Sequence, residues 1–501
     1  MASAAAVLFV QNDADDIGWW MAYHLALGFD ALIIIDDHSI DGTWEIIQSA
    51  TGLYPIEAQR AVENNGTLYA ERRSEAFAQA IATCRSRFDW VICLESDEYV
   101  YPETENTIGA YLDRFPDADA ITLHWSIFGS NGHVARTAQP PIAAYTRRAP
   151  LDFADHTLGK LFVRPSAVQN HVLDGCHFIL DESRHITASG QLFDAASPPG
   201  WDGARILHYV ARNMTHYTRR LARLPADVTP PDLWTHFNRN EEEDLCASRL
   251  VAATRDHAAR IARAGLNTFF WRLRQDIEAL SHSFLPENVF AIRERGNVPT
   301  GLSFDYARIE NGSGEYLAYR TDENSLVFIS PAASGKGTLP VWLITEHHHS
   351  PASPSKGVLV LPQDNTPPVI TGTFLTRWLP VQVEHNPFDD QASRPCRLLS
   401  LHGPGGFGHD VDGSLGLNAE PPMSLVLTPV QPDRATTDAL RSYLALRSRG
   451  DSLRDFVLGL DMMRAPHADA LACAIALLAP EARSALETRY AGLLPLWLSA
   501  A

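Results

Sequence analysis

The chain has 501 residues, of which 45% are hydrophobic, and its 41 Lys and Arg against 60 Asp and Glu give a formal net charge of −19. This length exceeds what one hydrophobic core usually serves, so we expect two or three domains, and the hydrophobic content excludes a largely disordered chain. The negative charge argues against nucleic acid as a partner, because a phosphate backbone repels an acidic protein.

Cysteine usage and hydropathy predict a cytoplasmic protein. The six cysteines form no C-x-x-C pair and no framework spacing, which is typical of free thiols in a reducing compartment. No stretch approaches the roughly 18 apolar residues that span a bilayer, and the first apolar residues predict a strand and not a signal peptide. We therefore expect no transmembrane segment, while association with the membrane surface stays open.

The first 130 residues alternate between strand and helix patterns. Short continuous apolar runs, typical of strands buried on both faces, occur at residues 7–10, 31–35, 90–94 and 120–125. We expect three helices in this part of the chain. The first begins after Asp13 or Asp15, either of which can cap it, the second begins after Asp41, and the third covers residues 71–88. Gly28 suits the left-handed end of the first helix. Strands that alternate with helices at this spacing predict a mostly parallel α/β sheet.

The rest of the chain divides into parts that differ in composition and in the spacing of their apolar residues. Arg, Ala and Leu recur at helical spacing up to about residue 295, and short β-type runs separated by Pro, Gly, Asn and Ser follow, which is typical of an antiparallel β domain. We expect four parts, namely an α/β domain at residues 1–215, a helical extension at 216–297, a β-rich domain at 298–430 and a C-terminal helical segment at 431–501.

Polar clusters follow three of the predicted strands, at residues 11–13, 36–39 and 95–98. Because ligands of open α/β sheets bind at the carboxyl ends of the strands, we expect these clusters to meet at one site. Glu95 and Asp97 are two residues apart on a segment taken to be extended, so their side chains should point to the same side. Two such carboxylates repel each other unless a divalent cation such as Mg²⁺ or Mn²⁺ binds between them.

Seven segments within residues 5–215 stand out in chain order and read VQNDAD with WMAYHLALG (10–15 and 20–28), IDDHSIDGT (35–43), DWVICLESDEY (89–99), WSIFGSNGH (125–133), YTRR (145–148), KLFVRP (160–165) and LHY (207–209). Taken in order, they resemble motifs of the family-2-like glycosyltransferases, especially the branch near glycosyltransferase family 92. The resemblance implies a GT-A fold, a Rossmann-like domain that transfers a sugar from a nucleotide-diphosphate sugar with Mn²⁺ or Mg²⁺ as its cofactor.

The resemblance also implies roles for single residues. The residues that would line the nucleotide are Asn12, Asp13, Asp36 and Asp37. Asp97 would bind the metal and the diphosphate. Glu95 stands where the family usually has an aspartate, so it would reach the metal or the donor either directly or through water. His208 closes the matching stretch and is a further candidate for a metal ligand, because neutral imidazole binds Mn²⁺.

Residue chemistry adds further candidates for the donor site. Arg73, in the predicted third helix, is suited to a diphosphate because a guanidinium binds phosphate oxygens in pairs. Lys160 and Arg164 lie four residues apart and could likewise reach phosphate. Trp125 could cover the face of a sugar ring.

These expectations together describe a metal-dependent glycosyltransferase that moves a sugar from a UDP- or GDP-sugar to a glycan, lipid-linked or polysaccharide acceptor. An inverting transfer needs a base for the acceptor hydroxyl, for which Asp155 is the first candidate and Asp152 the alternative. The alternative function is a non-catalytic protein that binds nucleotide sugars or glycans on the same fold, and Glu95 in the aspartate position favours it.

Overall fold

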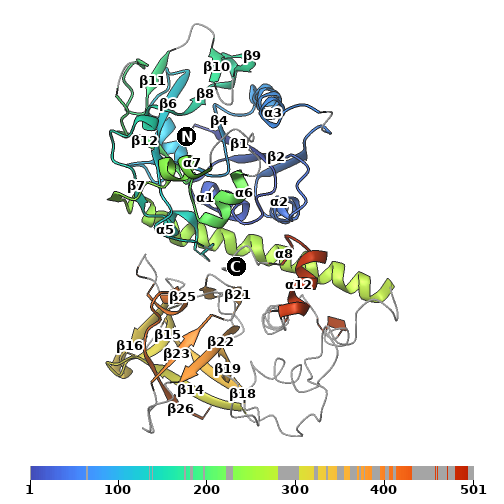
Figure 1. The fold of residues 1–501 in the computed structure, drawn as a ribbon, viewed down its shortest axis with the longest axis vertical. Helices are drawn as coiled ribbons and strands as arrows, with labels where there is room; N and C mark the ends of the chain where they lie inside the picture. The colour runs from blue at the N-terminus through green and yellow to red at the C-terminus, as the bar shows by residue number, and fades with distance from the viewer. Residues whose placement is uncertain are drawn as a thin grey trace. The chain divides into compact units, whose positions relative to one another are not determined.

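The structure of the protein is a computed structural model that describes the greater part of the chain. The described residues are 2–63, 66–134, 136–137, 139–173, 177–180, 184–195, 198–221, 230–279, 304–320, 325–333, 337–346, 355–360, 369–371, 374–376, 378–385, 395–400, 405–409, 413, 415–431, 457–458, 460, 471, 475 and 480–494. The chain folds into two compact units, residues 1–261 and 262–501 (Figure 1). The four-part division expected from the sequence stays a prediction.

Unit 1 is built on a nine-stranded sheet. Its strands are β1 (Ala4–Val10), β2 (Ala31–Asp36), β3 (Ile56–Arg60), β4 (Trp90–Leu94), β5 (Glu98–Pro102), β6 (Ala120–Ile127), β8 (Gly159–Val163), β11 (His185–Thr187) and β12 (Ala204–His208). They are ordered β3-β2-β1-β4-β8-β6-β12-β5, with β11 beside β6. Strands β3, β2, β1 and β4 are parallel, whereas β8 runs antiparallel to β4 and β6, and β5 runs antiparallel to β12. This confirms the predicted mostly parallel, Rossmann-like sheet.

Helices cover both faces of this sheet (Figure 1). The helices that begin in unit 1 are α1 (Ile17–Ala26), α2 (Thr43–Thr51), α3 (Tyr69–Cys84), α4 (Ile108–Leu112), α5 (Pro141–Ala144), α6 (Met214–Leu221), α7 (Pro230–Phe237) and α8 (Val251–Ala279), which continues into unit 2. Phe77 and Ile81 of α3 belong to one hydrophobic cluster with Ala5, Val7 and Phe9 of β1. Because strand side chains alternate between faces, this cluster marks one side of the sheet, and α1 and α2 lie on the other.

Short elements complete unit 1. Two further two-stranded sheets pair β9 (Val168–Leu173) with β10 (His177–Leu180) and β7 (Arg147–Arg148) with β13 (Glu242–Glu243). The 3-10 turns are η1 (Ala154–Thr157), η2 (Pro165–Ala167) and η4 (Cys246–Leu250).

The start of α1 differs from the expected capping. Asp16 occupies the N-cap position and its side chain makes no capping hydrogen bond. Asp13 contributes its backbone instead, because its carbonyl accepts hydrogen bonds from the amides of Asp16 (3.1 Å) and Ile17 (3.0 Å). The prediction that the Asp13 or Asp15 side chain caps this helix is therefore wrong, since Asp13 points its carboxylate into the interior of unit 1.

Two other helix boundaries agree with the sequence. Gly28 has a φ of +85°, the left-handed conformation predicted for the residue that ends α1. Asp41 accepts a hydrogen bond from the amide of Thr43, at 3.0 Å, at the start of α2. Helix α3 covers residues 69–84, so it is shifted toward the N-terminus relative to the prediction of 71–88.

Unit 2 contains the antiparallel β domain that the sequence predicts. Its strands are β14 (Phe304–Glu310), β15 (Tyr316–Arg320), β16 (Ser325–Ile329), β17 (Thr338–Pro340), β18 (Trp342–Glu346), β19 (Ser355–Val360), β20 (Val369–Thr371), β21 (Phe374–Thr376), β22 (Trp378–His385), β23 (Pro395–Leu399), β24 (Gly406–His409), β25 (Leu415–Ala419) and β26 (Leu425–Pro429). Because β26 pairs with both β14 and β23, the strands β14, β18, β19, β22, β23 and β26 close into an antiparallel barrel. Apolar side chains that include Leu343, Val381 and Leu398 fill it.

The C-terminal part of unit 2 contributes helix α12 (Pro480–Arg489), and η5 (Pro331–Ala333) lies earlier in the unit. The hydroxyl of Tyr490 donates to Asp276 of α8 at 2.6 Å, and its ring packs on Phe269 with the ring centres 5.1 Å apart. Most of the predicted helical tail at residues 431–501 lies outside the described residues. Among the helices described, none combines the length and the apolar character needed to cross a membrane.

Candidate functional site

The loops after β1 and β2 are joined at the carboxyl edge of the sheet, as the polar clusters predict. The amide of Asn12 donates to Ser39 Oγ at 2.8 Å, and the amide of Ile40 donates to Asn12 Oδ1 at 2.8 Å. The amide of Asp13 donates to Thr43 Oγ1 at 2.8 Å. Asn12 adopts a φ of +52°, a left-handed conformation that asparagine tolerates better than most residues. The structure therefore brings Asn12 and Asp13 together with the loop that follows Asp36.

Asp36, the last residue of β2, and Asp37, which follows it, each face an arginine. Asp36 is fully buried, pairs with Arg60 of β3 and accepts a hydrogen bond from the amide of Ser39 at 3.0 Å. Asp37 is bound by the fork of Arg72 from α3, through Nε at 3.2 Å and through Nη2. The side-chain amide of Gln11 donates to the same carboxylate at 3.1 Å. These contacts fix both aspartates beside the loop at residues 11–13.

The segment at residues 95–98 is a turn and not an extended strand end, so the expectation that Glu95 and Asp97 share one side is wrong. The amide of Glu98 donates to the carbonyl of Glu95 at 3.1 Å, which reverses the chain between β4 and β5. The Glu95 carboxylate pairs with Arg73 of α3, and its side chain is 34% exposed. Asp97 is only 3% exposed, and its carboxylate faces a different partner, His208. The two carboxylates therefore have different partners, Arg73 for Glu95 and His208 for Asp97.

Asp97 and His208 form a buried pair, although 111 residues separate them in the chain. Asp97 Oδ2 lies 3.6 Å from His208 Nε2, and the two side chains are 5% and 6% exposed. The ring of Trp125 packs against the His208 ring with centres 4.4 Å apart. Strand β12 lies beside β6 and β5, so its last residue reaches the turn that carries Asp97.

Glu98, which follows Asp97, binds side chains that lie next to this pair. It is 1% exposed and accepts hydrogen bonds from Trp125 Nε1 at 2.9 Å and from the Glu95 amide at 2.8 Å. Lys160 Nζ lies 3.1 Å from Glu98 Oε2, the oxygen that also accepts from the Glu95 amide. Burial raises the pKa of Glu98, and Lys160 opposes that rise. Lys160 and Trp125 are therefore at the predicted site, where they support Glu98.

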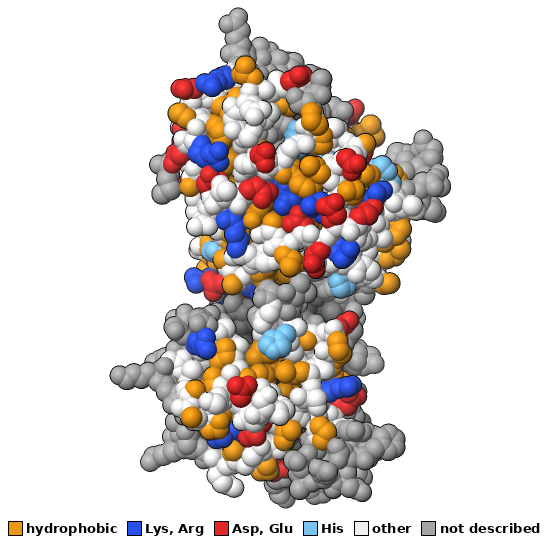
Figure 2. Space-filling view, turned by 90° about the vertical axis from the view of Figure 1, so that its left-hand side faces the viewer, with side chains coloured by type: hydrophobic (Ala, Val, Ile, Leu, Met, Phe, Trp, Pro, Cys, Tyr) orange, Lys and Arg blue, Asp and Glu red, His pale blue; other side chains and the backbone are white. Residues whose placement is uncertain are grey.

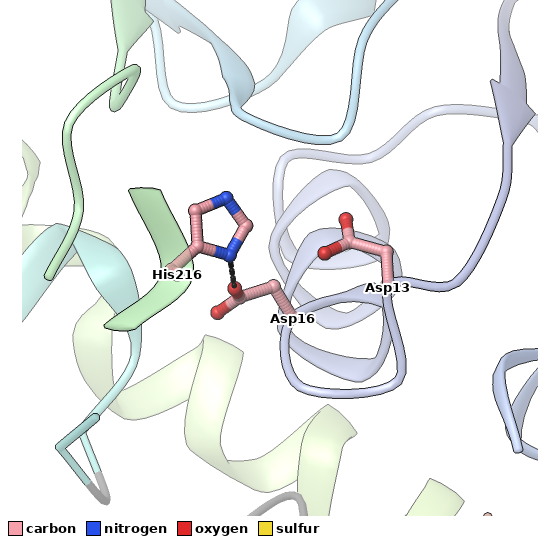
Figure 3. Close-up of side chains that lie close together, drawn as sticks. All are labelled: Asp13, Asp16 and His216. Atoms are coloured by element: carbon pink, nitrogen blue, oxygen red, sulfur yellow. Dashed lines mark ion pairs between the residues drawn. The ribbon is translucent and has the colours of Figure 1, made fainter. Parts of the chain in front are cut away.

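A second cluster of titratable side chains, two of them buried, lies beside the start of α1 (Figure 3). It consists of Asp13, Asp16 and His216 of α6, whose ligand-type atoms all lie within 4.8 Å of one another. Arg212 is fully buried among them, with Nη1 3.3 Å from Asp13 Oδ1, in contact with Asp16 Oδ2 and 3.5 Å from His216 Nε2. Burial, which Arg212 opposes, raises the pKa of Asp16 to about 6. For Asp13 burial again acts to raise the pKa, but Arg212 and His216 outweigh it and lower the pKa.

Arg164 does not reach this edge of the sheet. Its guanidinium donates to the carbonyls of Ala118 (2.7 Å) and Pro116 (2.8 Å) and lies over the ring of Trp90 at 4.4 Å. Because β8 runs antiparallel to β4, Lys160 at its start lies at the carboxyl edge, whereas Arg164 beyond its end lies at the amino edge. The prediction that Arg164 binds the donor at the carboxyl edge is therefore wrong.

The two predicted bases differ in their surroundings. Asp155, in η1, lies 2.7 Å from His236 Nε2 of α7, and the two side chains are 25% and 44% exposed. The ring of Phe153 packs beside His236 with centres 5.2 Å apart. Asp152 is exposed. The structure thus gives Asp155 an imidazole partner that sequence reasoning did not identify.

Three residues of the second cluster were also missed, namely Asp16, Arg212 and His216. Asp16 and His216 stand 200 residues apart, and Arg212 follows the last recognised motif by three residues. An arginine in a loop is usually solvated, so no local pattern marks this one as buried.

Acidic and basic side chains alternate over the face of unit 1 in Figure 2, so the net charge is not gathered into one patch there.

The mostly parallel sheet, with the loops after β1 and β2 joined at its carboxyl edge, is a Rossmann-like architecture of the GT-A class. Residues 2–193 of the chain match the family model of glycosyltransferase family 92. No curated protein sequence matches the chain.

Solved structures with similarity to the chain include two forms of TarS from S. aureus and HddC from Yersinia pseudotuberculosis. TarS 1–349 in complex with UDP-GlcNAc is 15% identical, with a TM-score of 0.27, over 56% of this chain and 76% of that chain. Longer TarS is 9% identical, with a TM-score of 0.23, over 86% of each chain. HddC is 12% identical, with a TM-score of 0.22, over 37% of this chain and 91% of that chain. TM-scores this low establish nothing about the function of this chain.

Proposed function

We propose that unit 1 transfers a sugar from a nucleotide-diphosphate sugar, either a UDP- or a GDP-sugar, with the help of a divalent cation. The observation that supports this proposal is the buried contact between Asp97 Oδ2 and His208 Nε2, 3.6 Å apart at the carboxyl ends of β4 and β12. In open α/β sheets this edge is where ligands bind.

The Asp97–His208 pair fits a divalent cation. Mg²⁺ and Mn²⁺ accept carboxylate oxygen, and imidazole nitrogen is a further ligand for Mn²⁺. His208 Nδ1 is buried and accepts or donates no hydrogen bond among the described residues, so the ring orientation is not set by a protein partner at that nitrogen. Neighbouring carboxylates face fixed cations instead, since Glu95 pairs with Arg73 and Glu98 with Lys160. We therefore assign the cation to Asp97 and His208, with Mn²⁺ favoured over Mg²⁺ because of the imidazole.

In the proposed reaction the acceptor oxygen bonds to the anomeric carbon while the bond from that carbon to the diphosphate breaks. A cation at this site would neutralise negative charge on the leaving nucleoside diphosphate. Trp125 holds the His208 ring from one side, and Asn12, Asp36 and Asp37 line the loops where the nucleotide would bind. We propose that Arg73, through its pair with Glu95, remains close enough to contact the donor.

The acceptor hydroxyl must lose a proton during this step. We propose that Asp155 and His236 receive it as a pair, in which the carboxylate orients the imidazole and His236 takes the proton. A carboxylate–imidazole contact of 2.7 Å is suited to this role because the carboxylate stabilises the protonated ring. Asp152 remains the alternative base. The acceptor would be a glycan, a lipid-linked sugar or a polysaccharide, and unit 2 is the proposed place for its recognition.

The proposal is tested by titrating the purified full chain with UDP and with GDP, in the presence and absence of Mn²⁺. We expect one of the two nucleotides to bind about tenfold more tightly with Mn²⁺ than without it, which corresponds to about 1.4 kcal/mol of binding free energy. The Asp97→Asn variant should lose this gain and also lose hydrolysis of the matching nucleotide sugar. Equal binding with and without Mn²⁺ in the wild type would contradict the proposal.

A matched control is Asp117→Asn, because the Asp117 side chain is 82% exposed in the same unit. This variant should bind and hydrolyse the donor as the wild type does. Metal-dependent binding without any release of nucleoside diphosphate, in every donor screened, would instead favour the non-catalytic alternative.

A further inference from the structure

Arg212 is a buried arginine in a strained backbone conformation. Its side chain is fully buried, and its φ of +46° lies in the left-handed region that residues other than glycine rarely adopt. It follows His208 by four residues, in the loop between β12 and α6. Backbone strain of this kind persists only where surrounding contacts hold it, so the contacts of the guanidinium indicate what the strain serves.

The guanidinium joins three segments that are distant in sequence. Its Nη1 contacts Asp13 and Asp16 in the loop after β1. Its Nη2 donates to the carbonyl of Ser96 at 2.6 Å. Ser96 lies between Glu95 and Asp97 in the turn after β4, so one side chain of the β12–α6 loop binds both the nucleotide-side loop and the turn that carries Asp97.

The same loop also holds the next carbonyl of the turn. The amide of Tyr209 donates to the carbonyl of Asp97 at 2.8 Å. Two consecutive carbonyls, those of Ser96 and Asp97, are therefore bound by the segment that begins at His208. This arrangement couples the position of the Asp97 carboxylate to that of the His208 ring.

The charge of the cluster also points to Arg212. Asp13, Asp16 and His216 are spaced as ligands of a metal ion would be, yet Nη1 of Arg212 already lies against all three. Burial acts to lower the pKa of Arg212, but Asp16 and Asp13 outweigh it and raise the pKa, so the side chain stays charged. A guanidinium that contacts two carboxylates and a backbone carbonyl does what a bound cation would do there.

We infer that Arg212 is a positioning residue of the donor site, a built-in cation that fixes the turn at residues 95–98 so that Asp97 faces His208. The inference rests on the proposed function, because it assigns Arg212 no contact with the donor or the metal and gives it an effect only through Asp97. It also implies that the Asp13–Asp16–His216 cluster binds no metal while Arg212 is present.

The test needs a variant that removes the guanidinium without leaving two uncompensated buried carboxylates. Arg212→Met alone would leave Asp13 and Asp16 without their counterion, and such a variant can fail to fold. The double variant Asp16→Asn/Arg212→Met removes one charge of each sign, and Asp16→Asn alone is its reference. Arg212→Lys keeps the charge but lacks the fork that reaches both Asp16 and Ser96.

Two measurements separate the inference from the proposed function. Amide hydrogen exchange of the peptide that covers residues 95–98, without metal or nucleotide, should be at least tenfold faster in the double variant than in Asp16→Asn. Mn²⁺ affinity, measured by calorimetry with the nucleotide that the wild type binds, should fall at least tenfold between the same two variants. Arg212→Lys should lie between them in both measurements.

Unchanged exchange in the folded double variant overturns the inference, and so does faster exchange with unchanged Mn²⁺ affinity. If the wild type shows no Mn²⁺-dependent nucleotide binding, the proposed function fails. The exchange measurement still decides in that case whether Arg212 holds the turn.

Discussion

Replacing Lys160 by methionine should destabilise unit 1 strongly, because it leaves a buried carboxylate without its counterion. Lys160 Nζ lies 3.1 Å from Glu98, and the two side chains are 6% and 1% exposed. Methionine has nearly the length of the lysine stem, so it fills the same volume without the charge. The variant therefore isolates the electrostatic contribution of the pair from the packing of the side chain.

The expected loss follows from the burial of the pair. Removing one partner of a buried ion pair costs about 3–5 kcal/mol. For a domain of this size about 1 kcal/mol shifts the melting temperature by roughly 2–4 °C, so Lys160→Met should lower it by on the order of 10 °C. Burial raises the pKa of Glu98 already, and loss of Lys160 raises it further. The penalty should therefore be smaller at acidic pH, where Glu98 takes up a proton.

Thermal and urea unfolding at pH 5 and pH 8 measure this effect. The matched control is Arg260→Met, which breaks an exposed pair with Asp256, 2.9 Å apart, whose side chains are 65% and 41% exposed. That change should cost under ~1 kcal/mol at either pH. The double variant Glu98→Gln/Lys160→Met should recover most of the loss. A Lys160→Met variant that loses no more stability than Arg260→Met would refute the reasoning.

Two further predictions concern protons. His24 is fully buried, and burial lowers its pKa to about 3, so the unfolded chain, with a histidine pKa of about 6.5, binds more protons below that pH. The stabilisation by neutral His24 is complete above pH 6.5 and is lost as the pH falls, by about 2 kcal/mol at pH 5. In urea unfolding, the free energy of unfolding of His24→Leu should therefore fall less steeply at acidic pH than that of the wild type. His236→Gln and Asp155→Asn should each lower kcat by about 10²-fold or more with nucleotide affinity unchanged; full kcat in His236→Gln with loss in Asp152→Asn would transfer the role to Asp152.

The parallel part of the fold was predictable from the sequence because its strands are apolar on both faces. Residues 31–35 and 90–94 are continuous apolar runs, and they form β2 and β4. Hydrophobic burial decides such segments locally, so the sequence needs no knowledge of the neighbours. The position of the loops at residues 11–13 and 36–39 follows from the parallel order of β1 and β2, which is why the sequence predicts that these two loops meet.

The errors arose where direction along the sheet matters. Lys160 and Arg164 are both cationic and lie in β8 and directly after it, yet β8 is antiparallel to β4, so the two cations lie at opposite edges of the sheet. The turn at residues 95–98 reverses the chain immediately after β4, which separates Glu95 from Asp97. Strand direction and turn geometry depend on distant pairing partners, and a single sequence does not contain that information in any local pattern.

The site also shows why a large negative charge does not by itself predict a metal site. Of the carboxylates at the carboxyl edge, Asp36 faces Arg60, Asp37 faces Arg72, Glu95 faces Arg73 and Glu98 faces Lys160. Asp13 and Asp16 share Arg212. A guanidinium or ammonium held in such a pair competes with any divalent cation, because it already neutralises the charge of the carboxylate. Asp97 differs because it faces His208, whose imidazole can be neutral and can itself bind a metal. The resemblance to the family already points to Asp97 and His208 as metal ligands, and the fold adds a physical reason for that proposal, which is the identity of the side chain that faces each carboxylate.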